Sequence, residues 1–180
     1  ATLYDIISPT VPIITDVSVD ANGKAIISWS CTAIDIDSFE IYKEVGQGWI
    51  TIGIVPASTT TFLYNSSNAA NLYETFAVRA LDSCDNASIR SEEHNSINIE
   101  TQVNTCDFTV QLNWNEYINI TDGISHYNLF ITETDQFGII TSSTDRLTTE
   151  MNYTINNING GSNYYIYVVA YNADSTIAAT

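Results

Sequence analysis

The chain repeats itself once along its length. Three short hydrophobic segments of the first half return in the same order in the second half, at offsets of 85, 88 and 90 residues. The pairs are 25–29 with 110–114, 38–42 with 126–130, and 76–82 with 166–172. Such a repeat indicates a tandem duplication of one small domain. We therefore predict two domains, 1–98 (with 1–9 as a leading segment) and 99–180, each large enough for one modest core.

Apolar residues alternate with period two inside the repeated segments. Ala25, Ile27 and Trp29 share one side of an extended chain, and Trp114 ends an equivalent series. This alternation is typical of half-buried strands, and Asp/Asn/Gly turns separate them. The sequence therefore predicts an all-β chain of two tandem seven-stranded immunoglobulin-like β-sandwiches, with Trp29 and Trp114 in their cores. The predicted strands are 13–19, 24–30, 37–43, 49–55, 60–64, 74–82 and 88–97, then 98–103, 108–114, 125–133, 138–142, 152–156, 163–171 and 175–180.

Charge and hydropathy exclude several classes of function. Five Lys and Arg residues face 21 Asp and Glu residues, which gives a net charge of −16. A chain this acidic is repelled by phosphate backbones and anionic lipid, so we expect no nucleic-acid binding. No run of 18 apolar residues occurs, so we expect no membrane insertion. The first residues do not resemble a signal peptide, and we expect a processed protein or a segment of a longer one.

The strand motifs resemble those of fibronectin type III domains over nearly the whole chain. The first half carries Ile27-Ser28-Trp29 and the segments 36–42 and 78–82, and the second half carries a more specific motif at 158–164. That motif is similar to the family's Leu-x-Pro-Gly-Thr-x-Tyr turn, with Gly160 where proline is usual. The resemblance implies that Tyr164 forms a tyrosine corner, in which its hydroxyl bonds the backbone near the turn. Tyr73 stands in a degenerate version of the motif.

A narrower resemblance concerns the segments 82–88, 91–97 and 106–117. They are similar to paired fibronectin-like domains of large secreted bacterial proteins. The proteins of this class carry a gliding-motility-associated C-terminal sorting domain and are exported by the type IX system. The sequence departs from that class at Asp85, where glycine is usual, and it lacks a cysteine beside Tyr164. The resemblance implies an extracellular or cell-surface location.

Residues 94–100 at the junction contain no Gly or Pro, so we also expect a stiff pair of domains.

Three cysteines are an odd number for an extracellular protein. In this fold Cys31 follows the second strand and Cys84 follows the sixth, at the same end of the first sandwich, so we predict a Cys31–Cys84 disulfide. Cys106 is then unpaired, or paired with a residue beyond Thr180. The alternative is three free, buried thiols.

Four carboxylates fall in loops at that same end of the first domain: Asp35, Asp37, Asp82 and Asp85. Loop carboxylates are ligands that calcium prefers, so this set is a candidate for weak calcium binding. The alternative is a solvated acidic surface, because the spacing matches no known calcium-binding loop. We expect no other cofactor.

The sequence gives no support for catalysis. It contains no nucleophile elbow, phosphate-binding loop or His-Glu-x-x-His motif, and its two histidines lie in different repeats. We therefore expect a non-catalytic structural or adhesive spacer whose partners are other domains of the same long chain. Two alternatives are a specific protein- or polysaccharide-binding module and an accessory region of a secreted hydrolase, and the fold class alone does not separate them.

Overall fold

The computed structural model describes residues 5–174 and 177–179, and all regular structure in them is β-strand. The all-β prediction is confirmed. The chain divides into two compact units, unit 1 at Ala1–Ser96 and unit 2 at Ile97–Thr180. Within the described residues there is no helix of the length and apolar character needed to cross a membrane.

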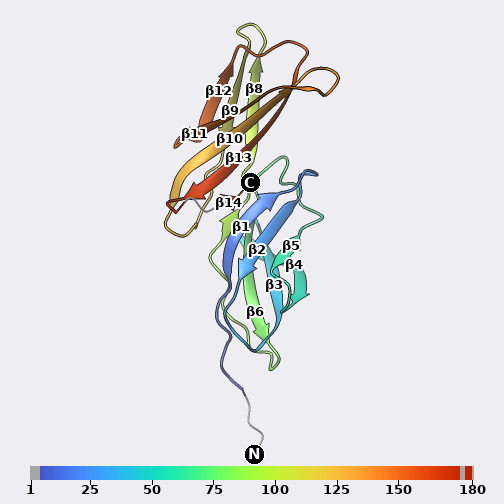
Figure 1. The fold of residues 1–180 in the computed structure, drawn as a ribbon. Coiled ribbons are helices and arrows are strands. Elements are labelled where there is room, and N and C mark those ends of the chain that lie inside the picture. The colour runs from blue at the N-terminus through green and yellow to red at the C-terminus, as the bar shows by residue number, and fades with distance from the viewer. Residues whose placement is uncertain (1–4, 175–176, 180) are drawn as a thin grey trace, which may run out of the picture. The chain divides into compact units, whose positions relative to one another are not determined.

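Unit 1 contains two antiparallel sheets, with strand orders β1-β2-β5 and β4-β3-β6-β7 (Figure 1). Strands consecutive in sequence pair with one another, and two pairings, β2 with β5 and β3 with β6, join strands that are distant in sequence. The strands are β1 (Ile13–Val19), β2 (Ala25–Ser30), β3 (Ile36–Val45), β4 (Gly48–Pro56), β5 (Thr61–Leu63), β6 (Thr75–Asp82) and β7 (His94–Asn95).

Unit 2 has the same strand order, with β8-β9-β12 in one sheet and β11-β10-β13-β14 in the other. The duplication visible in the sequence is therefore also a duplication of topology. The predicted last strand at 175–180 lies partly outside the described residues, which include Ile177–Ala179 of it. The strands are β8 (Ile99–Asn104), β9 (Thr109–Trp114), β10 (Ile124–Thr134), β11 (Ile140–Thr148), β12 (Asn152–Asn156), β13 (Asn163–Asn172) and β14 (Ile177–Ala179).

An edge-to-face aromatic pair joins the two sheets of each unit. In unit 1 the Trp29 ring on β2 meets Phe39 on β3 at 5.4 Å between centroids. In unit 2 the Trp114 ring on β9 meets Tyr127 on β10 at 5.8 Å. Both tryptophans are buried, at 3% and 6% exposure. Such pairs add about 0.5–1.5 kcal/mol beyond the burial of their area, so each tryptophan fixes how its two sheets face one another.

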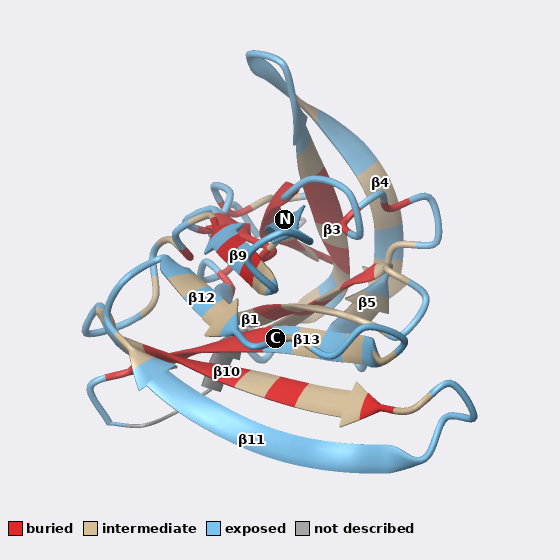
Figure 2. Ribbon diagram, turned by 90° about the horizontal axis from the view of Figure 1, so that it is seen from above, coloured by how far each residue is buried: buried red, intermediate tan, exposed pale blue. Residues whose placement is uncertain are grey.

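Strand β11 differs most from its prediction in unit 2. A strand was expected at 138–142, and the structure has one at Ile140–Thr148. Figure 2 shows β11 exposed along its length, whereas buried and partly buried residues alternate along β10. Because β11 is an edge strand paired only with β10, it needs no apolar face, and a Ser/Thr/Asp-rich segment is sufficient to form it.

The last segment of unit 1 also differs from its prediction. A strand was expected at 88–97, but only His94–Asn95 pair with β6 as a ladder, at Phe76 and Thr75. Elsewhere serines close the edge of β6. Ser88 donates its N–H to the Ala80 carbonyl and accepts the Ala80 N–H on its hydroxyl, both at 2.9 Å. Ser88 thus satisfies both backbone groups of Ala80.

The same arrangement recurs at two more serines. Ser91 pairs in this way with Val78, at 2.8 Å and 3.0 Å, and Ser96 with Glu74, both at 3.0 Å. The hydroxyls of Ser88 and Ser91 also donate to the carbonyl oxygen of the following residue, both at 2.8 Å. All three serines are buried, at 5%, 9% and 0% exposure. We call residues 88–96 the serine edge.

Between Ser88 and His94 the serine edge advances three residues for every two residues of β6. Ser88, Ser91 and His94 face Ala80, Val78 and Phe76 respectively. A regular strand would have placed Arg90 on the same side as Ser88 and His94. In the structure Arg90 is exposed instead. The serine hydroxyls therefore determine which residues of this segment face solvent.

Replacing Ser91 tests this role of the hydroxyl. We expect Ser91→Ala to destabilise unit 1 by about 1–3 kcal/mol, because the buried Val78 N–H loses its acceptor. The exposed Ser58 is a matched control, and Ser58→Ala should cost less than about 0.5 kcal/mol. Urea unfolding of the full chain measures both, and equal effects of the two variants would contradict the assignment.

His94 makes the stability of unit 1 depend on pH. Burial lowers the pKa of His94 to about 4, from an ordinary value of 6.5. Between pH 6.5 and pH 4 this histidine is protonated in the unfolded chain but neutral in the folded chain. The free energy of unfolding therefore falls as the pH falls through this window. We expect unit 1 to lose about 2 kcal/mol between pH 7.5 and pH 5. His94→Gln should remove most of this slope, and an unchanged slope in that variant would place the titrating group elsewhere.

Candidate functional site

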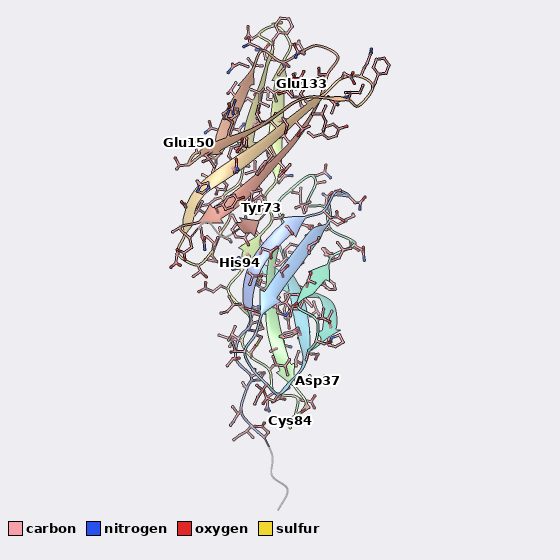
Figure 3. The ribbon with its side chains drawn as sticks, in the orientation of Figure 1. Asp37, Tyr73, Cys84, His94, Glu133 and Glu150 are labelled. Carbon is pink, nitrogen blue, oxygen red and sulfur yellow. The ribbon has the colours of Figure 1, made fainter. Side chains whose placement is uncertain are left out.

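Three carboxylates of unit 1 lie together, and they overlap only partly with the predicted calcium set. One oxygen from each of Asp5, Asp35 and Asp82 lies within 4.8 Å of the others. In the part of the chain that the structure describes, this is the one group of three or more His, Cys, Asp or Glu side chains close enough to share a metal ion. Asp37 (Figure 3) and Asp85 do not belong to it. Asp5, from the leading segment, was not among the predicted ligands.

Asp82 already has a structural role. Its Oδ1 accepts the backbone N–H of Cys84 and of Asn86, both at 2.8 Å, and its Oδ2 accepts the Asn86 side-chain amide at 2.7 Å. The hydrogen bonds from Asn86, and the one from Cys84, hold the pKa of the Asp82 carboxyl below its usual value against the opposing effect of burial. Asp85, in the same turn, has a φ of 65°, a conformation that favours glycine. Asp82 is therefore the group that shapes this turn.

The predicted Cys31–Cys84 disulfide is not formed in the structure, which has all three cysteines free. Cys31 is half-buried, and its thiol donates to the Thr10 carbonyl at 3.4 Å. Cys84 (Figure 3) and Cys106 are exposed. The alternative of three free, buried thiols therefore agrees with the structure in that the thiols are free, but not in that they are buried. Thr10, between the leading segment and β1, thus supplies a partner for Cys31 that strand placement alone did not reveal.

Tyr164 bonds the turn that precedes its strand. Its hydroxyl accepts the backbone N–H of Asn159 at 2.9 Å, which is the contact of a tyrosine corner. The Asn159 side-chain amide donates to Glu133 (Figure 3) at 2.7 Å, and this bond is the main cause that lowers the pKa of the Glu133 carboxyl.

Tyr73 in unit 1 is 55% exposed. Glu150 is also exposed and lies just after β11 (Figure 3).

The outer face of the larger sheet of unit 1 carries a cluster of charged and aromatic side chains. Glu40 on β3 accepts hydrogen bonds from the Tyr42 hydroxyl at 2.6 Å, the Arg79 Nε at 2.6 Å and the Thr51 hydroxyl at 3.0 Å. Burial raises the pKa of Glu40, but the three hydrogen bonds outweigh burial and hold its pKa below the ordinary value. Glu40 is therefore ionised at neutral pH and fixes one edge of Arg79.

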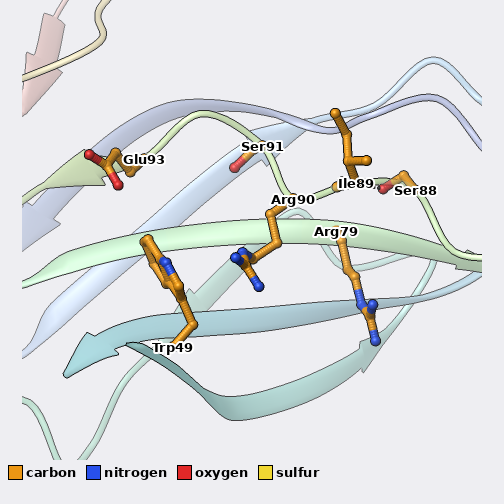
Figure 4. A pocket seen from close by; sticks show the side chains of 7 residues that line it. All are labelled: Trp49, Arg79, Ser88, Ile89, Arg90, Ser91 and Glu93. Carbon is orange, nitrogen blue, oxygen red and sulfur yellow. Dashed lines mark hydrogen bonds between the residues drawn. The ribbon is translucent and has the colours of Figure 1, made fainter. Parts of the chain in front are cut away.

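Arg90 continues this cluster through cation–π contacts with two rings. The guanidinium carbon of Arg79 lies 5.5 Å from the centre of the Tyr42 ring, and that of Arg90 lies 5.4 Å from the same ring. Arg90 also lies 5.3 Å from the Trp49 ring. We call Arg79, Tyr42, Arg90 and Trp49 the arginine ladder. Figure 4 shows Trp49, Arg90 and Arg79 in a row along the direction of the strands.

Three members of the arginine ladder, Arg79, Arg90 and Trp49, line a hollow of about 570 Å³. Its other lining residues come from the serine edge: Ser88, Ile89, Ser91 and Glu93 (Figure 4). Strand periodicity did not predict this site, because a regular strand at 88–97 that buries Ser88 and His94 would bury Arg90 on the same side. A three-residue spacing of Ser88, Ser91 and His94 was the available signal.

Comparisons with known proteins identify no family by sequence. No family model matches the chain, and no curated protein matches it. Among solved structures, an Fn3-like protein from Clostridium thermocellum matches with 19% identity and a TM-score of 0.41, over 48% of this chain and 90% of its own. The FN1–FN3 domains of chicken CNTN1 match with 11% identity and a TM-score of 0.42, over 96% of this chain and 69% of their own. Both structural neighbours are fibronectin type III-like.

The acidic group can be tested with a pair of matched variants. In the presence of EDTA we expect Asp35→Asn to raise the melting temperature of unit 1 more than Asp37→Asn, because only Asp35 faces two other carboxylates at short range. In millimolar calcium the melting temperatures of the two variants should differ less, because bound calcium relieves the same repulsion where Asp35 is kept. If magnesium acts as strongly as calcium, the group is a solvated acidic surface and not a calcium site.

Proposed function

We propose that the chain is a non-catalytic structural module of a longer extracellular or cell-surface protein, in which two fibronectin type III-like sandwiches space or present other domains. The observation that supports this proposal is how the buried ionisable groups are used. Glu74 is 3% exposed, and its carboxylate accepts hydrogen bonds from Ser67, the Asn68 backbone and Lys43. It therefore ties the β5–β6 connection to β3.

Two other carboxylates of unit 1 act in the same way. Glu40 links three strand residues, and Asp82 holds the turn after β6. A catalytic carboxylate needs free lone pairs and a pKa matched to proton transfer. These carboxylates have their oxygens engaged and their pKa values, where shifted, lowered. This use of charge suits a structural domain better than an active site.

A second candidate function is a binding module, and the arginine ladder favours it. The chain has only five Lys and Arg residues, yet two of them line one hollow beside a tryptophan. Arg and Trp are the residue types enriched where proteins bind their partners. Export by the type IX system and a place in a bacterial surface protein remain proposals that rest on the sequence resemblance alone.

A spacer should hold its two units in one arrangement. Because residues 94–100 contain no Gly or Pro, we expect small-angle scattering of the full chain to fit a single conformation. Inserting Gly-Gly-Ser after Asn98 provides the flexible control and should broaden the distribution of interdomain distances. Scattering by the unaltered chain that already requires the broad distribution would contradict the spacer function.

A further inference from the structure

The arginine ladder holds Arg90 in a form suited to a ligand. The guanidinium carbon of Arg90 lies over the Tyr42 ring, 5.4 Å from its centre, and over the Trp49 ring, 5.3 Å from its centre. A cation–π contact holds the charge in place without supplying an acceptor for the five N–H donors of the group, so these donors stay available to a ligand. Among the described residues Arg90 makes no ion pair. Its charge is therefore positioned by two rings without being neutralised by a carboxylate.

Arg79 presents a second guanidinium to the same hollow. Its Nε donates to Glu40, and this bond fixes the orientation of the group. Arg79 and Arg90 contact the same Tyr42 ring, and both line the hollow. A planar guanidinium with a fixed orientation binds a carboxylate through two parallel hydrogen bonds, and fixing it in advance lowers the entropy lost on binding.

The remaining walls suit a sugar ring. Ile89 is 77% exposed, and the half-buried Trp49 ring adjoins Arg90, so apolar surface lies beside the guanidinium groups. A volume of about 570 Å³ lies within the usual range for small-ligand sites. From this combination, we propose that the hollow binds uronic-acid residues of an acidic polysaccharide. The carboxylate pairs with Arg90, and the apolar side of the sugar packs against Trp49 and Ile89.

Other anionic partners fit the hollow less well. A dense polyanion is repelled by the net charge of −16, and Glu93 in the lining adds to this repulsion. A bound peptide commonly pairs its main chain with a free strand edge. The Ser88 and Ser91 N–H groups in the lining are already donated to β6. A polysaccharide that carries single uronic-acid residues among neutral sugars needs neither a strongly positive surface nor a free edge.

The test uses the full chain and three probes. These are a galacturonic acid trisaccharide, a neutral trisaccharide of the same linkage, and a glutamate-rich peptide. We expect NMR titration at low salt to show binding of the galacturonate probe with shifts at Trp49 and Ile89. Arg90→Ala should weaken this binding at least about tenfold, as expected for a charge-assisted bidentate pair. The matched control is Arg146→Ala in unit 2, which removes the same charge and should change the affinity less than about twofold.

Arg90→Lys separates a built site from general attraction. It keeps the charge but loses the planar fork, so we expect it to weaken binding nearly as much as Arg90→Ala. Full binding by the lysine variant, equal losses in the Arg90→Ala and Arg146→Ala variants, or tighter binding of the neutral or peptide probe would overturn the proposal. So would no binding of the galacturonate probe at millimolar concentration. This inference rests on the second candidate function, and its failure leaves the scattering test of the spacer function unaffected.

Discussion

The edge of β6 that faces away from β3 is the constraint on which the rest of unit 1 depends. This strand lies between β3 and the chain that returns at 88–96, and its outward backbone groups are buried there. A buried N–H without an acceptor costs about 1–3 kcal/mol, so several such groups would use up much of the stability of a domain of this size. Ser88, Ser91 and Ser96 remove that cost with hydroxyls in place of a regular ladder. Because a serine can both donate and accept, the segment need not keep the spacing of a strand.

The change of spacing links the fold to the candidate site. With three residues for every two of β6, Ser88, Ser91 and His94 are buried, and Arg90 and Glu93 are exposed. Arg90 then reaches the rings of Tyr42 and Trp49 on the outer face of the neighbouring strands. In an acidic chain this places a positive group against two aromatic rings, with no carboxylate paired to it among the described residues. The carboxylates of Glu74 and Glu40, by contrast, pair with Lys43 and Arg79 and also accept hydrogen bonds from neighbouring hydroxyl groups.

Much of the fold follows from sequence because burial on one face enforces period-two alternation. Ala25, Ile27 and Trp29 identify β2 for this reason, and the duplication extends the assignment to Trp114 on β9. The length of β11 was not predictable in this way, because a strand exposed on both faces shows no alternation. The exposed position of Arg90 was not predictable for a different reason, because hydrogen bonds from the serine hydroxyls to the backbone changed the period of its segment. The grouping of Asp5 with Asp35 depends on the path of the leading segment, which carries no periodic signal.

Amide hydrogen exchange of the full chain tests the central claim most directly. The N–H groups of Glu74, Val78 and Ala80 each donate to a serine hydroxyl, at 3.0, 3.0 and 2.9 Å. If these bonds close the edge of β6, the three amides should exchange as slowly as those of Ala77 and Arg79 in the same strand, and in Ser91→Ala the Val78 amide should accelerate most. If the three amides exchange as fast as the amide of Gly46 in an exposed turn, the edge is open, and the account of how Arg90 is positioned is wrong.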